Sequence, residues 1–227
     1  MLIFFIGTCL GSFLCVVAQR VPQKKSFMLS RSQCDHCQQV LRSWELIPLL
    51  SAVLLRFRCQ RCKVRFSSIS WWAELIYGGL LLFIWQQPTL SAKLITGVWL
   101  TTAFLLTLTD LFYWLVEPRL LYPLHGLLWW IMFYQNQEFH WETLAIVGVL
   151  ASSLSLFYQH AIGLGDLILL LLWSPWLTLN QFALLVLVAS ASAIVIFCGY
   201  AILRITQIRL PFVPFLSFGL FVAYFLL

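Results

Sequence analysis

Charged side chains are scarce in this sequence. Asp, Glu, Lys and Arg together make up 10% of its 227 residues, whereas a soluble domain contains about 25%. Acidic residues are the scarcest, with eight in the whole chain. Hydrophobic residues reach 62%, and the mean hydropathy is +0.92. This balance excludes a soluble globular protein and indicates an integral membrane protein, in which every acid that is kept needs an explanation.

Two common hydrolase motifs are also missing. The chain contains no Ser-x-x-Lys, which would pair a serine nucleophile with a lysine. It contains no His-Glu-x-x-His, which would place two zinc ligands and a glutamate base on one helix. Any hydrolytic centre in this protein must therefore be built from other side chains.

Long uncharged stretches, by contrast, recur along the whole chain. About 20 apolar residues span a bilayer as a helix, and a helix satisfies its own backbone polar groups in lipid. The stretch 167–203 is too long for one span, and Pro175 and Asn180 mark its expected break. The first stretch has no basic region before it and no cleavage site after it, so we expect a retained span. The chain then has eight candidate spans, which come from the stretches 1–19, 75–92, 94–109, 120–137, 143–159, 167–203 and 210–227.

Basic residues gather in one loop, between the first and second candidate spans. Only Asp35 and Glu45 oppose them there. The positive-inside rule therefore predicts that this loop faces the cytoplasm and, with eight spans, that both termini face outward. Asp110, at the end of the third span, and Asp166, at the start of the sixth, would then both reach the cytoplasmic boundary. The basic residues of the loop are Arg20, Lys24, Lys25, Arg31, Arg42, Arg56, Arg58, Arg61, Lys63 and Arg65.

Four of the seven cysteines form two close pairs in this loop. The sequence reads CDHC and then, after 21 residues, CQRC. Two Cys-x2-Cys knuckles hold zinc tetrahedrally through four thiolates, and a reducing cytoplasm disfavours disulfides. We therefore predict a structural zinc ion that fixes the loop, with two disulfides or four unligated thiols as the alternative. The predicted ligands are Cys34, Cys37, Cys59 and Cys62.

Two isolated aspartates lie at the ends of membrane-length segments. Asp110 follows an apolar run in TDLFYWLVEP, and Asp166 follows two glycines in HAIGLGDLIL. An ionisable residue against a membrane span is costly, which makes each a functional candidate. Each also has a local alternative, because Asp166 could cap the sixth helix and Asp110 could be a boundary acid. Together, on one side of the membrane, they suggest a pair.

A pair of carboxyl groups can hydrolyse a peptide bond without a covalent intermediate. Two acids held close together cannot both ionise, so one stays protonated while the other is charged. The charged one takes a proton from water, and the neutral one polarises the carbonyl of the scissile bond. Gly163 and Gly165 would let a backbone or a substrate approach Asp166 closely. His160 could tune this acid or could be a boundary histidine.

Several motifs, in their order along the chain, resemble those of the type IV prepilin leader peptidases, most closely the competence-type members of Gram-positive bacteria. GSFLCVVAQRVP is similar to the family's exit from the first span, and LRSWELIPLLS is similar to part of its cysteine loop. Glu74 falls where the family carries a glutamate at the start of the second span. TDLFYWLVEP and GLGD match its two aspartate motifs, and the second is the signature of membrane aspartyl proteases.

The resemblance implies a function. Asp110 and Asp166 would be the catalytic dyad of a membrane aspartic endopeptidase, and Glu74 would support the site. The substrates would be prepilin or pseudopilin precursors, cut at the cytoplasmic face between a short basic leader and an apolar helix. Many members also methylate the new N-terminus with S-adenosylmethionine. This chain departs from the family pattern at Cys15 and Ile168 and has no glycine-rich methyltransferase motif, so methylation stays an open alternative.

The whole sequence predicts an all-α fold, a polytopic helical bundle in the bacterial cytoplasmic membrane with its active site facing the cytoplasm. Its parts would be a first span (1–18), a cytoplasmic zinc loop (19–70) and a seven-span peptidase domain (71–227). A proton-coupled carrier is a second interpretation, although it would favour acids near mid-span and internal repeats. A docking module built on the zinc loop is a third, and it would leave both aspartates dispensable.

Overall fold

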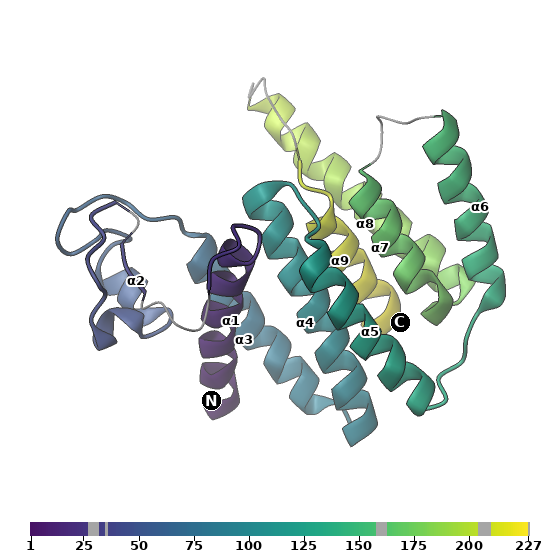
Figure 1. Cartoon of the computed structure of the whole chain (residues 1–227), viewed down its shortest axis with the longest axis horizontal. Helices are drawn as coiled ribbons and strands as arrows, with labels where there is room; N and C mark the ends of the chain where they lie inside the picture. The colour runs from purple at the N-terminus through teal and green to yellow at the C-terminus, as the bar shows by residue number, and fades with distance from the viewer. Residues whose placement is uncertain (27–31, 35, 158–162, 204–209, 227) are drawn as a thin grey trace. The chain divides into compact units, whose positions relative to one another are not determined.

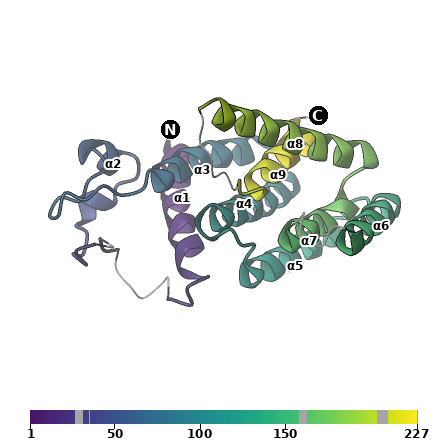
Figure 2. The same cartoon turned by 90° about the horizontal axis from the view of Figure 1, so that it is seen from above.

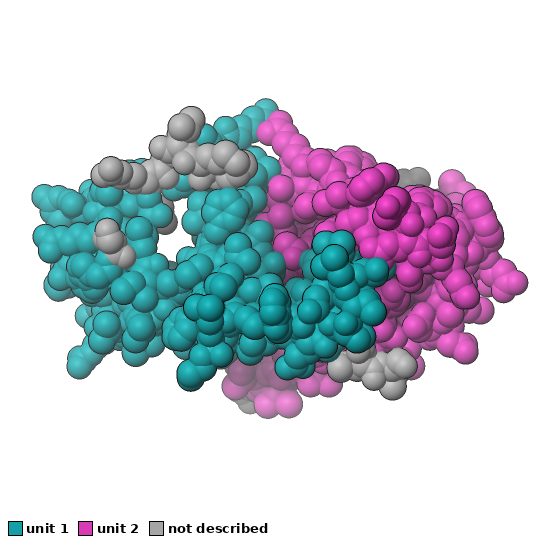
Figure 3. Space-filling model, turned by 90° about the horizontal axis from the view of Figure 1, so that it is seen from below, with its two compact units in different colours: residues 1–97 teal, residues 98–227 magenta. Residues whose placement is uncertain are grey.

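The computed structural model describes residues 1–26, 32–34, 36–157, 163–203 and 210–226, and every regular element within them is a helix (Figure 1). The chain divides into two compact units, residues 1–97 (unit 1) and 98–227 (unit 2), which Figure 3 colours separately; the boundary lies within α4. The all-α prediction is confirmed. The elements are α1 (Leu2–Arg20), η1 (Ser43–Leu46), α2 (Leu50–Leu54), α3 (Ile69–Gln86), α4 (Leu90–Tyr113), α5 (Pro118–Tyr134), α6 (Trp141–Phe157), α7 (Leu164–Trp173), η2 (Ser174–Trp176), α8 (Leu179–Ile202), α9 (Val213–Leu220) and η3 (Phe221–Leu226).

Each apolar segment that the sequence assigns to the membrane forms a helix in the described part of the chain. The longest segment divides near Pro175, as predicted, where the 3₁₀ turn η2 separates α7 from α8. Helix α8 begins directly after Thr178, whose hydroxyl accepts the N–H of Gln181 at 3.3 Å and so caps the helix. Asn180, which the sequence places at the break, lies inside α8 instead.

Among the described residues, three helices are long and apolar enough to cross a bilayer by length and composition: α1, α4 and α8. Helices α6, α7 and α9 are apolar but shorter than the roughly 20 residues of a full crossing. Helices α3 and α5 contain 18 and 17 residues. The chain is a multi-pass membrane protein, and its number of spans stays a prediction.

The core of unit 1 is the antiparallel pair α1 and α3, which Figures 1 and 2 show side by side. A Cβ added to Gly7 would lie 2.8 Å from the Cα of Gly78. One added to Gly11 would lie 2.8 Å from the carbonyl oxygen of Ala73. Small residues allow this approach, and membrane helices depend on it because lipid provides no hydrophobic drive for their association. The cysteine loop leaves α1 and returns to α3, so this pair carries it.

Unit 2 is held together by close packing and by polar pairs between helices. Gly219 of α9 lies so near α8 that an added Cβ would overlap a carbonyl oxygen of that helix. The hydroxyls of Thr107 and Ser217, 2.9 Å apart, connect α4 with α9. The indole N–H of Trp173 donates to Nε2 of His125 at 3.0 Å and connects α7 with α5. These contacts join α4 and α8 to α9, and α5 to α7; Asp110 lies on α4 and Asp166 on α7.

Candidate active site

The helix ends that carry the predicted catalytic pair lie at one end of unit 2. The C-terminal end of α4 and the N-terminal ends of α5, α7 and α9 are all found there (Figure 1). Asp110 lies in the last turn of α4, and Asp166 lies in the first turn of α7. Two acids that are distant in the sequence therefore share one end of the helical bundle.

Asp110 is buried and is bound to the start of another helix. Only 7% of its surface is exposed. Its Oδ2 accepts the backbone N–H of Val213 at 3.0 Å, and the N–H of Phe212 donates to the same carboxylate. The first N–H groups of a helix have no partner within it and attract negative charge. Asp110 therefore caps α9 from across the bundle.

Asp166 does not cap its own helix. Gly163 is the N-cap residue of α7, and the backbone N–H of Asp166 donates to the Gly163 carbonyl at 3.1 Å. The Asp166 side chain is half-buried, and its carboxylate lies close enough to Asp110 for the two charges to interact. The catalytic role of the pair stays a prediction. His160, the suggested tuning residue, lies outside the described residues.

A side chain in place of either glycine before Asp166 would crowd its neighbour, and the overlap is more severe at Gly165 than at Gly163. A Cβ on Gly163 would approach Oδ2 of Asp166 to 3.1 Å. A Cβ on Gly165 would come within 2.7 Å of Cγ2 of Val116, in the segment that follows α4. Non-bonded carbon atoms prefer about 3.5–4.0 Å, so a methyl group at Gly165 must displace its neighbour. Within the chain, these glycines lie against a carboxylate and a valine, and the close approach of a substrate to Asp166 stays a prediction.

A third carboxylate, which the sequence analysis does not single out, lies in the same segment. Glu117 directly follows Val116, is 7% exposed and is the N-cap residue of α5. Its Oε1 lies 3.8 Å from Nε of Arg119, whose side chain is 55% exposed. The signal that could have found Glu117 is the proline that follows it, because proline favours the first position of a helix.

Glu74 lies in unit 1, where it holds the cysteine loop. It is 7% exposed, and its Oε2 accepts the backbone N–H of Leu49 at 2.8 Å. Leu49 has a φ of 62°, a conformation that residues other than glycine rarely adopt. The hydrogen bond therefore stabilises the unusual turn between η1 and α2 and ties the loop to α3. Support of the catalytic site by Glu74 stays a prediction.

The four predicted metal ligands come together in unit 1. Their sulfur atoms all lie within 4.8 Å of one another, with 3.8 Å between Cys34 and Cys62 and 3.9 Å between Cys37 and Cys59. Four sulfurs bound at about 2.3 Å to a tetrahedral zinc ion lie about 3.8 Å apart. A disulfide needs about 2.05 Å, so the alternative of two disulfides does not fit this arrangement.

The two cysteine pairs fold in the same way. In each pair, the backbone N–H of the first cysteine donates to the carbonyl oxygen of the residue five positions later. The carbonyl oxygen of the same cysteine accepts the backbone N–H of the residue four positions later. That residue, Gln38 or Lys63, has a positive φ, which closes the turn and directs both sulfurs inward. The backbone N–H groups of Cys62 and Arg61 donate to the Cys59 sulfur and lower the pKa of that thiol. The donor set therefore fits a soft divalent ion.

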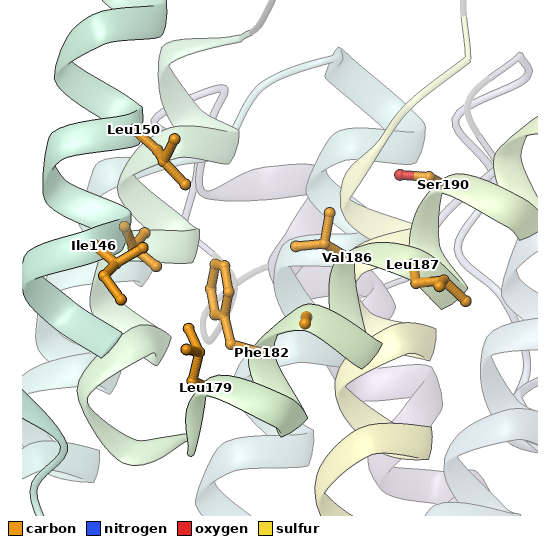
Figure 4. A pocket seen from close by; sticks show the side chains of 9 residues that line it. Ile146, Leu150, Leu179, Phe182, Val186, Leu187 and Ser190 are labelled. Carbon is orange, nitrogen blue, oxygen red and sulfur yellow. The ribbon is translucent and has the colours of Figure 1, made fainter. Parts of the chain in front are cut away.

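An apolar cavity of about 470 Å³ lies elsewhere in unit 2, between α6 and α8 (Figure 4). Its walls include Leu150, Phe182 and Val186, and Ser190 is the polar residue at its edge. None of the described residues that line it carries an acid or a base. This cavity therefore offers no group for hydrolysis, in contrast to the end of the bundle that holds the two aspartates.

Comparisons with known proteins extend this description. Residues 5–87 match the family described as Bacterial Peptidase A24 N-terminal domain. A prepilin leader peptidase/N-methyltransferase of Myxococcus xanthus is 31% identical over 86% of this chain and 61% of its own length. A type 4 prepilin-like proteins leader peptide-processing enzyme of Escherichia coli is 28% identical over 94% of this chain and 88% of its own length.

A prepilin leader peptidase/N-methyltransferase of Bacillus subtilis is 30% identical over 53% of this chain and 49% of its own length. No solved structure shows a significant match. The chain spans about three fifths of the length of the Myxococcus relative, and its match to the Escherichia coli relative includes nearly the whole of this chain. The domain match and these relatives agree with the resemblance in the motifs, and the chain is similar to prepilin leader peptidases along most of its length.

Proposed function

We propose that this chain is a membrane aspartic endopeptidase that removes the leader from prepilin or pseudopilin precursors. The observation that carries the proposal is the placement of Asp110 and Asp166, from different helices, within electrostatic range of each other. The names of the relatives supply the substrate class, because they describe the processing of prepilins. A carrier is expected to hold its acids near mid-span, whereas Asp110 and Asp166 lie in the end turns of their helices.

In the proposed mechanism the two acids have different roles. Asp110 activates the water, because its Oδ2 already accepts the N–H of Val213, a hydrogen bond that strengthens when the carboxylate is charged. Asp166 keeps the proton that the pair shares and donates it toward the scissile carbonyl oxygen. Water loses a proton to Asp110 and adds to the carbonyl carbon. The tetrahedral intermediate then collapses, and the departing amine takes up a proton from the pair.

The proposed metal is zinc, held by the four clustered cysteines of unit 1. Because four sulfurs complete a tetrahedral shell, such an ion stabilises the loop and leaves no open position for a substrate. The relatives' names also include an N-methyltransferase activity, for which S-adenosylmethionine would be the methyl donor. Methylation of the product is a separate question, and the mass of the product answers it.

We place the aspartate end of the bundle at the cytoplasmic side of the cell membrane. The support is the concentration of ten basic residues between Arg20 and Arg65, against two acids. A precursor whose polar leader stays in the cytoplasm while its apolar helix lies in the bilayer would present the scissile bond at this boundary.

Co-expression with a pilin-like precursor tests the proposed function. The expected result is a product that lacks the leader and begins at the residue before the apolar helix, as read by intact mass and N-terminal sequencing. An added methyl group would show that the second activity is also present. A precursor that keeps its leader, with the peptidase accumulated in the membrane, would contradict the proposal.

Gly165→Ala is expected to slow leader removal while the protein still accumulates. The new methyl group would overlap Val116 and shift the first turn of α7, which carries Asp166. We expect a loss of about tenfold to a hundredfold, because a displacement of about 1 Å at a reacting group can cost roughly 10²-fold. Gly148→Ala is the matched control, since an added Cβ there meets nothing within 4 Å. Equal cleavage rates for the two variants would show that the contact with Val116 does not position Asp166.

A further inference from the structure

The cysteine loop carries a set of apolar side chains that none of the described segments covers. Between η1 and the end of α2, several large hydrophobic residues are exposed. The most exposed is Leu54, at 70%, followed by Val53 at 56% and Leu50 at 52%. We name this set the apolar face of the loop; its members are Trp44, Leu46, Ile47, Leu50, Val53 and Leu54.

Helix α2 is amphipathic, but its large apolar side chains lie on its exposed face. A helix that packs on a soluble core buries such side chains instead. Leu50, Val53 and Leu54 lie at positions i, i+3 and i+4 and therefore share one helix face, which is exposed. Ala52 points into the loop and is 7% exposed. Large apolar residues that gather on one exposed face mark an interaction surface. The short helix thus presents its larger side chains outward.

Cations accompany the apolar face. Arg56 and Arg58 follow α2 directly, and Arg42 precedes η1. Lys63 and Arg65 lie in the second cysteine turn, and all five side chains are exposed. Apolar and aromatic side chains together with lysine and arginine are typical of segments that lie in the headgroup region of a membrane.

The loop is also held beside the membrane helices. Its chain ends join α1 and α3, and within unit 1 Figures 1 and 2 show α2 to the side of this pair. The hydrogen bond from Leu49 to Glu74 holds the start of α2 at the beginning of α3. The rings of Phe57 and Trp71, 6.2 Å apart, form a second contact. A loop that extends sideways from a membrane helix end faces the bilayer surface around that helix.

We propose that the apolar face of the loop docks on an anionic phospholipid surface, with Leu50, Val53 and Leu54 among the acyl chains and Arg56 and Arg58 at the headgroup phosphates. The argument for lipid is charge complementarity and continuity with α1, which is long and apolar enough to cross the bilayer. This proposal does not depend on the proposed peptidase activity. A second copy of the chain or a soluble protein partner would be different occupants, and the test distinguishes them.

The test uses the full-length protein in vesicles and a photoreactive benzophenone amino acid at Leu54. The vesicles contain phosphatidylcholine with phosphatidylglycerol, or phosphatidylcholine alone. The same amino acid is placed at two control positions. Val195 of α8, whose side chain is 68% exposed on an apolar helix, is the positive control, and Gln60, an exposed polar residue of the loop, is the negative control. We expect Leu54 to crosslink lipid as Val195 does, and far more than Gln60. Zinc content checks that each variant keeps its loop.

The cations are tested in the same assay. Arg56→Gln with Arg58→Gln should lower the lipid crosslink at Leu54, because each basic residue at an anionic surface contributes roughly fivefold to binding. The control is Lys24→Gln with Lys25→Gln, which removes the same amount of positive charge just after α1. It should lower the yield of lipid crosslinks at Leu54 less than the double arginine variant does. Crosslinks from Leu54 to protein, or a yield no higher than at Gln60, would overturn the proposal. An equal yield with and without phosphatidylglycerol would overturn the assignment to anionic lipid.

Discussion

Asp110→Asn is expected to abolish leader removal without loss of the protein from the membrane. Asparagine keeps the size of the side chain, and its carbonyl oxygen can still accept the N–H of Val213 that Asp110 now binds. It cannot carry the negative charge that takes a proton from water. Removal of one member of a catalytic unit costs about 10⁴-fold or more, so we expect cleavage to fall at least that far. Cleavage rates in vesicles measure the effect.

Two further variants separate the chemistry of Asp110 from its role as a cap. Asp110→Ala removes the acceptor for α9 as well as the charge, and loss of a cap typically costs about 1 kcal/mol of stability. It should therefore be both inactive and less stable than Asp110→Asn. Glu142→Gln, which neutralises an exposed acid in the first turn of α6, should cleave at the parent rate. An Asp110→Asn protein with near-parent activity would refute the proposed role of Asp110.

Cys59→Ser is expected to remove the metal and to unfold the cysteine loop. In its described residues the loop contains two short helices and two isolated bridges, so a bound ion would supply much of its order. Structural zinc sites of this kind contribute about 10–16 kcal/mol of binding free energy, which is folding free energy for the loop. Metal analysis should find one zinc ion per chain in the purified parent protein and much less zinc in the purified variant. Limited proteolysis should then cut the variant within the loop.

Cys198→Ser is the matched control for this experiment. Cys198 lies in α8 and is exposed, and it belongs to no cluster of ligands among the described residues. We therefore expect its zinc content and its proteolysis pattern to equal those of the parent. If Cys59→Ser also kept a full complement of zinc and an intact loop, the four-cysteine site would not be what holds the loop together.

The sequence predicts the parts of this protein that depend on local patterns. Apolar runs locate the membrane helices because their composition alone decides whether they enter lipid. The break near Pro175 follows from the effect of proline on a helix. The cysteine cluster follows from the spacing within each pair, since a Cys-x2-Cys turn directs both sulfurs to one side.

Contacts between distant segments could not be predicted in this way. The bond from Asp110 to Val213 joins residues that are 103 positions apart, and no local pattern marks it. The fit of Gly165 against Val116 depends on how α7 meets the end of α4. The sequence also suggested that Asp166 could be a cap, but the structure gives the capping role to Asp110, on a different helix. Such roles depend on how the helices pack, which can be seen only once the three-dimensional structure is known.

The most direct test of the central claim is a double-variant cycle at the two aspartates. Single-turnover cleavage of one pilin-like precursor would be measured in vesicles for the parent, Asp110→Asn, Asp166→Asn and the protein that carries both changes. Residues that act as one unit are not additive, so we predict that the double variant is no slower than either single variant. Losses that multiply in the double variant, or near-parent cleavage by either single variant, would show that Asp110 and Asp166 are not a catalytic pair.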